Sequence, residues 1–404
     1  MTLADPSMTM QRPAASSDAM PKSGTRDPRL DFFRGIAMFI ILIAHIPSNW
    51  LTLWIPARFG FSDATETFVF CSGMASAIAF GRAFRDKGWI MGSTRVSFRI
   101  WQVYWAHIGL FFAIAATMVA LNSLFPDGRN YVSQLNLHPF FNNTQTNLIG
   151  LMTLTYVPNY FDILPMYMVI LAMMPIMIGL VRIHLGLAIA FSLSLWLCAN
   201  VIGWNFPAEP WSERGWFFNP LGWQLIFFTG FALMAGWIPA PPVSKTLFWV
   251  AVAVIVISLP FAYFRIFNGL QDVFPYFREW REEYRFLFNK TDFGILRYIH
   301  FLATAYVAWV LVGPKGANIQ PSGGTAFLSR VWEKVLAVIM KVGQQSLAVF
   351  IGSMYLARVL GALFDQVGRT HFTMLWVNAL GFALIIGVAY GAGWFKSQPW
   401  KKKA

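Results

Sequence analysis

Stretches of about 20 mostly apolar residues recur along the whole chain, separated by short polar segments. A helix of this length can cross the hydrocarbon core of a bilayer, which is about 30 Å thick. The pattern therefore predicts an all-α fold, a polytopic membrane helix bundle of about ten transmembrane helices. The expected spans are residues 32–50, 64–82, 98–121, 163–182, 185–202, 220–238, 246–264, 293–312, 337–361 and 373–394.

A shorter apolar stretch, NLIGLMTLTYV at 147–157, is too short to span and is followed by Pro158. It predicts a re-entrant or interfacial helix. Composition supports the membrane assignment, because 57% of the 404 residues are hydrophobic and only 12% are charged, against about a quarter charged in soluble domains. Cys71 and Cys198 both fall within predicted spans and are interpreted as small packing residues rather than a disulfide pair.

The distribution of lysine and arginine predicts how the spans are oriented. With the N-terminus in the cytoplasm, 20 of the 31 basic residues fall in inner segments, nine in outer segments and two within spans. This asymmetry follows the positive-inside rule and places both termini in the cytoplasm. The net charge of +13 is then a topology signal with some affinity for anionic membrane lipids, and nucleic-acid binding is not expected.

The predicted domain organisation is simple. Residues 1–29 are polar and are expected to form a disordered cytoplasmic tail. Residues 30–395 form the transmembrane domain, and residues 396–404 form a basic cytoplasmic tail.

The first predicted span, DFFRGIAMFIILIAHIPSNW, carries two ionisable residues, Arg34 and His45. Eleven residues of helix cover about 16 Å and about three turns, so both side chains lie on nearly the same face. Arg34 is expected near the inner surface and His45 near the middle of the bilayer. Ionisable residues inside a membrane are costly, so each is a functional candidate, although a lone histidine on an apolar helix is more often a packing residue.

The second span begins FSDATETFVFCSG, which places Asp63 and Glu66 on one helix face. A carboxylate beside His45 would orient the imidazole for general-base catalysis. The alternative is that Asp63 caps the helix, which does not account for Glu66. In the third span, Arg95 and Arg99 lie one turn apart at the cytoplasmic end. They are interpreted either as ordinary positive-inside anchors or as a site that grips the phosphates of a cytosolic ligand.

These segments resemble a known class of membrane enzyme. RGIAMFIILIAH resembles the Arg-x10-His signature of acyltransferase-3-type membrane acyltransferases, FVFCSGM resembles their second-span Phe-x-x-Ser-Gly element, and RVSFRI resembles their third-span arginine pair. Six segments in order also resemble the OpgC family of osmoregulated periplasmic glucan succinyltransferases. They are DPRLDFFRGIAM, GFSDATETFVFCSG, LTYVPNYFDILPMYMVIL, FNPLGWQLIFFTG, LRYIHFLATAY and GQQSLAVFIGSMYLARVL.

The resemblance implies a multi-pass enzyme of the cell inner membrane that moves an acyl group, succinyl first of all, from cytosolic acyl-CoA to hydroxyls of periplasmic glucans. It implies that His45 is the general base, oriented by Glu66 or Asp63, with an acyl-histidine intermediate as an alternative to direct transfer. The implied donor-binding residues are Arg34, Arg95, Arg99 and Arg297, the last for the carboxylate of a succinyl group. The implied acceptor-binding residues are Asp162, Asn219, Trp223, Gln224 and His300. Ser346, Tyr355 and Arg358 complete the implied polar lining.

For each of these lining residues, a hydrogen bond between packed helices is an equally good explanation. No metal and no permanently bound cofactor is expected, since acyl-CoA is a substrate; the other partners are the glucan and membrane lipids, and an oligomer is left open. Two other functions also stay open. Spans with intramembrane charges suit a proton-coupled glucan transporter, and the same mechanism would serve an acetyltransferase of another envelope polysaccharide.

Overall fold

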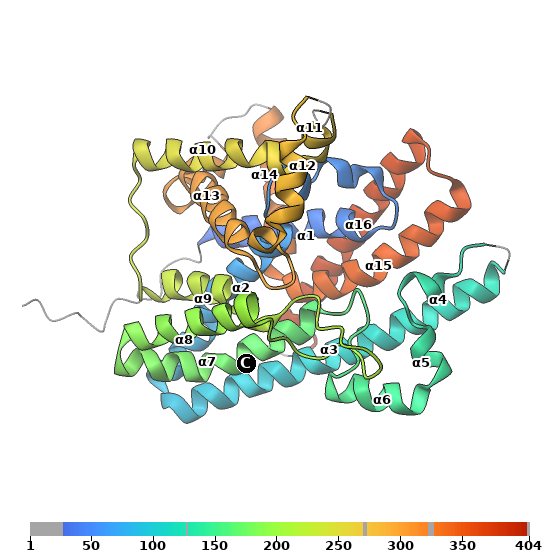
Figure 1. The fold of residues 1–404 in the computed structure, drawn as a ribbon, viewed down its shortest axis with the longest axis horizontal. Helices are drawn as coiled ribbons and strands as arrows, with labels where there is room; N and C mark the ends of the chain where they lie inside the picture. Colours follow the sequence, from blue (N-terminus) through green and yellow to red (C-terminus); the bar gives the residue numbers. More distant parts are fainter. Residues whose placement is uncertain (1–26, 127, 270–272, 322–326, 402–404) are drawn as a thin grey trace, which may run out of the picture.

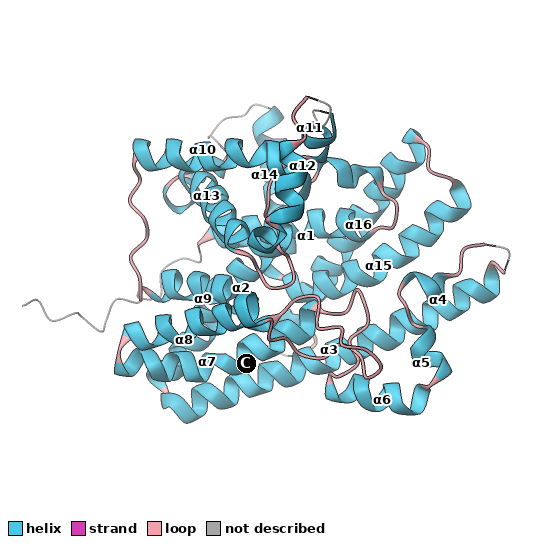
Figure 2. Ribbon diagram, in the orientation of Figure 1, coloured by secondary structure: helices cyan, strands magenta, loops and turns pink. Residues whose placement is uncertain are grey.

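The computed structural model describes residues 27–126, 128–269, 273–321 and 327–401. Within these residues the regular elements are helices (Figure 2). An isolated β-bridge joins Pro207 to Gly215. The predicted all-α class is confirmed. Residues 1–26 of the predicted N-terminal tail and residues 402–404 of the predicted C-terminal tail lie outside the described residues.

Eight of the described helices are long and apolar enough to cross a membrane. They are α2 (Ala64–Asp86), α3 (Gly88–Leu124), α7 (Ile163–Ile183), α8 with the π-helical turn that extends it (Leu185–Ile202), α10 (Lys245–Ala262), α13 (Ile295–Val312), α15 (Ser346–Val367) and α16 (His371–Ser397). Two further helices, α1 (Pro28–His45) and α9 (Pro220–Ala235), lie at the remaining predicted spans. The predicted polytopic helical bundle is confirmed (Figure 1).

The predicted bounds of the ninth span, 337–361, are wrong. That range covers parts of two helices, α14 (Phe327–Gln344) and α15, which are separated at Gln345. The first half of α14 carries Arg330, Glu333 and Lys334 among apolar residues, and such an amphipathic helix suits an interface rather than the centre of a bilayer. The continuous apolar stretch that can span therefore begins only after Gln345.

The predicted first span also ends too late. Pro47 follows α1, and a proline disfavours helical conformation in the residue before it, so Ile46 is extended, with φ −72° and ψ 117°. His45, which was predicted to lie near the middle of the bilayer, is consequently the last residue of α1. We call the end of the bundle where α1 ends and α2 begins the outer end, and the opposite end the inner end.

α3 is much longer than the predicted third span. Its 37 residues cover about 56 Å, so it continues beyond a hydrocarbon core of about 30 Å. Three short helices follow it at one edge of the molecule: α4 (Tyr131–Gln134), α5 (His138–Asn142) and α6 (Thr144–Thr153) (Figure 1). α6 lies at the predicted short apolar stretch, and its ten residues confirm that this segment is too short to span.

The outer loops contain further short elements. The loop after α1 holds two 3-10 turns, η1 (Trp50–Trp54) and η2 (Pro56–Arg58). Between α10 and α13 lie α11 (Phe264–Gly269), α12 (Tyr276–Glu283) and the 3-10 turn η4 (Arg285–Phe288). A further 3-10 turn, η5 (Pro314–Ile319), follows α13 at the inner end.

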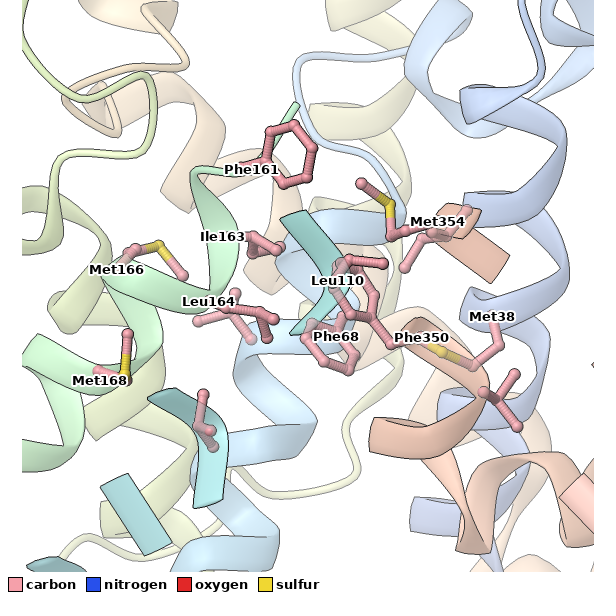
Figure 3. Packing of buried hydrophobic residues seen from close by; sticks show 14 of the residues in the cluster. Met38, Phe68, Leu110, Phe161, Ile163, Leu164, Met166, Met168, Phe350 and Met354 are labelled. Atoms are coloured by element: carbon pink, nitrogen blue, oxygen red, sulfur yellow. The ribbon is translucent and has the colours of Figure 1, made fainter. Parts of the chain in front are cut away.

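α1 and α2 connect the two halves of the bundle. α2 packs on α1, α3 and α9, and α1 packs on α14 and α15. Phe68 of α2, Leu110 of α3, Leu164 of α7 and Phe350 of α15 belong to one apolar cluster (Figure 3). This cluster fixes the helices whose outer ends carry the polar residues described below. Cys71 is buried, and the cysteines are free thiols, as predicted.

Candidate active site

His45 ends α1, and its ring is held by the helix itself. Nδ1 lies 2.7 Å from the carbonyl oxygen of Ile41, one turn earlier. A carbonyl oxygen can only accept a hydrogen bond, so Nδ1 carries the hydrogen and the neutral ring keeps an unprotonated Nε2. That nitrogen is the one able to accept a proton from a hydroxyl group.

Tyr160 packs against His45 in an edge-to-face arrangement, with ring centroids 5.3 Å apart. Its hydroxyl donates a hydrogen bond of 2.6 Å to the carbonyl of Met354, and the guanidinium of Arg358 lies 4.0 Å from the centre of its ring. Tyr160 has φ +89°, a conformation that a bulky residue adopts only under strain. The contacts on both sides of the ring therefore hold Tyr160 in place beside the histidine.

A pocket with a volume of about 510 Å³ opens beside His45 at the outer end. Its polar lining, besides His45, consists of Ser48, Asn49, Thr52, Arg58, Arg129, Gln134 and Arg358. Three of these residues are arginines and none is acidic, so the pocket wall carries positive charge. We call this the outer pocket.

Arg34 and His45 contact the same neighbouring helix. Arg34 donates a hydrogen bond to the Ser346 hydroxyl at the start of α15. Three turns further along α15, Arg358 donates a 2.7 Å hydrogen bond to the carbonyl oxygen of His45. The Arg34 side chain thus contacts the start of α15, and the backbone of His45 contacts the middle of the same helix.

Asp63 and Glu66 form a capping box at the start of α2. Asp63 accepts a hydrogen bond from the backbone of Thr65 at 2.6 Å, and the Glu66 carboxylate accepts one from the backbone of Asp63 at 2.8 Å. The expectation that capping leaves Glu66 unexplained is wrong. Glu66 is also completely buried and accepts a 2.7 Å hydrogen bond from Nε of Arg297.

Both carboxylates are therefore paired with cations and do not contact His45. Lys290 lies 2.6 Å from Asp63, and Arg297 lies 3.5 Å from it. Burial alone would raise the pKa of Asp63, but the charges of Lys290 and Arg297 hold this pKa below its usual range. The predicted orientation of His45 by a carboxylate is thus replaced by the contacts with Ile41 and Tyr160.

The predicted donor-binding arginines lie in separate places. Arg34 is half-buried against α15, whereas Arg95 is exposed on α3. Arg99 is half-buried on α3 and donates a 3.1 Å hydrogen bond to Gln102. Arg297 is neutralised by Glu66, so the predicted pairing of Arg297 with a ligand carboxylate does not match its surroundings.

Three of the predicted acceptor-binding residues are fully buried and hydrogen-bonded within the protein. Asn219 caps α9 and also bonds to Asp292 at 2.9 Å. The indole of Trp223 donates to the carbonyl of Lys290 at 2.9 Å, and Gln224 bonds to the Ser192 hydroxyl at 2.7 Å. The packing explanation of these residues fits the structure better than a sugar-binding role.

Asp162 and His300 lie at the outer end and are also buried. Asp162 accepts a 2.9 Å hydrogen bond from the backbone of Phe217, and burial raises the pKa of Asp162 to about 6. His300 lies 2.7 Å from the Ser62 hydroxyl through Nδ1. The outer pocket is lined by other residues, so the structure does not bring these two together with His45.

Sequence reasoning missed Arg58, Arg129 and Tyr160. Arg58 and Arg129 lie in outer segments, where basic residues run against the positive-inside rule, and this was a usable signal. Tyr160 carried no such signal, because a tyrosine in a loop is unremarkable until its strained backbone and its neighbours are known.

The fold and the pocket define a multi-pass helical membrane protein with a histidine and a basic cavity at one end of the bundle. The family model described as OpgC protein matches residues 26–397, and the chain belongs to this family. No curated protein and no solved structure gives a match. Membership supports a membrane acyltransferase-type role in glucan modification.

Proposed function

We propose that the protein is an inner-membrane O-acyltransferase that moves a succinyl or related acyl group from cytosolic acyl-CoA to hydroxyls of periplasmic glucans. The observation that carries the proposal is the unprotonated Nε2 of His45 beside the outer pocket. A base at this position can meet a sugar that arrives from outside and a thioester that arrives from inside.

The reaction is a direct transfer with His45 as general base. Nε2 accepts the proton of the glucan hydroxyl while the hydroxyl oxygen forms a bond to the thioester carbonyl carbon. The carbon–sulfur bond then breaks, and the leaving thiolate takes the proton from the imidazolium, which gives the glucan ester and free CoA. The Nδ1–H donated to Ile41 keeps the ring oriented through both steps.

The donor enters from the inner end. Arg34 lies eleven residues before His45 on α1, about 16 Å closer to the inner end. In this proposal Arg34 guides the thioester arm, and Arg95 with Arg99 on the inner part of α3 holds the phosphates of the nucleotide.

The test uses the purified protein in lipid nanodiscs with labelled succinyl-CoA and periplasmic glucan. We expect ester on the glucan, and we expect His45→Ala to lower kcat by about 10²-fold to 10⁴-fold, the usual contribution of a general base. His138→Ala is the matched control, because His138 is exposed and its hydrogen-bond partner is Ser133.

Normal turnover by His45→Ala would exclude its role as the base. Acylated His45 isolated after donor is added without glucan would replace direct transfer by an acyl-histidine route. In sealed proteoliposomes, movement of intact glucan without any ester would instead support a transporter. Ester formed from acetyl-CoA on another envelope polysaccharide, and none on glucan, would support the acetyltransferase alternative.

A further inference from the structure

The outer pocket has a chemistry that a neutral sugar does not require. Three arginines, Arg58, Arg129 and Arg358, line it together with His45, and none of the described residues of its lining is acidic. Building on the proposed function, we infer that Arg358 and Arg58 form a subsite for the distal carboxylate of a dicarboxylic acyl group. The pocket then selects the acyl donor.

Arg358 is the central residue of this subsite. One terminal nitrogen donates to the carbonyl of His45 at 2.7 Å, and the guanidinium plane is supported by the ring of Tyr160. Its Nε is buried and has no hydrogen-bond partner among the described residues. A buried donor without a partner is energetically unfavourable, and more so when it is charged, so this nitrogen is suited to an anionic ligand.

The other two arginines differ in how far their charge is already balanced. Arg58 is exposed and donates to the carbonyl of Thr52 at 3.1 Å, a neutral acceptor. Arg129 lies 3.4 Å from Asp365, which also pairs with Arg369 at 2.7 Å. The charge of Arg129 is therefore partly balanced, and Arg358 and Arg58 are the cations available to a carboxylate.

The direction of the substrate agrees with this placement. A thioester that reaches His45 from the inner end places its carbonyl carbon at Nε2, and the rest of the acyl chain continues toward the outer pocket. A carboxylate at the far end of that chain then meets Arg358, which contacts the backbone of His45 itself. Arg297, the residue expected from the resemblance, is already paired with buried Glu66.

The experiment compares two donors, succinyl-CoA and acetyl-CoA, with glucan as the acceptor. The measured quantity is the ratio of kcat/KM for succinyl-CoA to kcat/KM for acetyl-CoA. We expect Arg358→Gln to lower this ratio by about 10-fold to 100-fold, the range of a charge-assisted hydrogen bond, and Arg58→Gln to lower it by a smaller factor. Arg358→Lys keeps the charge without the planar fork and should fall in between.

Arg278→Gln is the matched control, because it removes one exposed cation of α12 at the same end of the molecule, paired with Glu282. It should leave the ratio unaltered. If Arg358→Gln fails to fold, the donor ratio of Arg58→Gln tests the inference instead. Arg58 is exposed and its side chain donates one hydrogen bond, to Thr52, so its replacement should not disturb folding.

Transfer with an unaltered donor ratio in the arginine variants would overturn this inference and leave the proposed function standing. A higher KM for glucan at a constant donor ratio would also overturn it, by assigning the pocket to the acceptor. If the unaltered protein forms no ester with succinyl-CoA and none with acetyl-CoA, this result would instead contradict the proposed function.

Discussion

At the scale of single residues, the structure separates charges that hold the fold together from groups available for chemistry. Glu66 and Arg297 are buried, hydrogen-bonded to each other and part of the start of α2. His45 is held by a backbone carbonyl and by the ring of Tyr160, so its Nε2 stays unprotonated and available. A buried charge paired with an opposite charge indicates a structural role, whereas a half-buried histidine with an unprotonated ring nitrogen beside a pocket indicates a chemical one.

The ion pair between Glu66 and Arg297 should stabilise the fold as a unit. Glu66→Ala removes the nearest counter-charge of buried Arg297 and leaves only Asp63, 3.5 Å away and shared with Lys290. We expect this variant to lower the free energy of unfolding by about 3–5 kcal/mol, the usual cost of breaking a buried ion pair. The double variant Glu66→Leu with Arg297→Met removes both charges and should be clearly more stable than Glu66→Ala. Thermal unfolding in detergent micelles measures both. Equal stability of the single and double variants would show that the pair does not act as a unit.

At the scale of helices, glycines allow backbones to approach closely. A Cβ at Gly73 of α2 would overlap the carbonyl of Phe227 on α9, and a Cβ at Gly230 of α9 would overlap the carbonyl of Phe70 on α2. Within a bilayer, helices associate mainly through such close packing, because lipid tails are as apolar as the side chains they replace. The reciprocal pair therefore sets the distance between α2 and α9.

Gly73→Ala tests this contact. The added methyl group has no space, so we expect a loss of about 1–3 kcal/mol, as in other overpacked sites. Gly109→Ala on α3 is the control, since a Cβ there would meet nothing within 4 Å. Alanine favours a helix over glycine, so the control should be neutral or slightly more stable. A comparable loss of stability in both variants, measured by thermal unfolding, would contradict the role given to the α2–α9 contact.

At the scale of the whole molecule, the position of the outer pocket can be compared with the predicted orientation of the chain in the membrane. The end of α1, the start of α2 and the outer pocket lie at the end predicted to face the periplasm. The C-terminal end of α16, at Ser397, lies at the opposite end and precedes a run of lysines. Because acyl-CoA and glucan would meet from opposite sides, this orientation is essential to the proposed reaction.

Cysteine labelling checks the orientation. Exposed Glu213, in the outer loop before α9, and exposed Gln398, just after α16, are each replaced by cysteine. In right-side-out vesicles a membrane-impermeant maleimide should label Glu213→Cys at once and Gln398→Cys only after permeabilisation. The unaltered chain controls for reaction of Cys71 and Cys198. The reverse pattern would invert the topology and exclude donor entry from the cytoplasm.

The family and the helical class could be predicted from the sequence, and so could the shared face of Arg34 and His45. The end of the first span was predicted wrongly, because the effect of Pro47 on the end of α1 was overlooked. The function of Asn219 and Gln224 could not be judged either, since a polar residue near a helix start serves a cap, a packing contact and a binding site equally well. Only the partners of each side chain distinguish these roles.

The sequence by itself determined that this chain crosses a membrane repeatedly as helices, because a hydrocarbon environment requires long apolar segments with internally paired backbones. It also determined that Arg34 and His45 share a face, because helical periodicity is local. Only the tertiary structure decided that Glu66 pairs with Arg297 and that Arg58, Arg129 and Arg358 surround one pocket. Those contacts join residues far apart along the chain, and their geometry depends on how the helices pack.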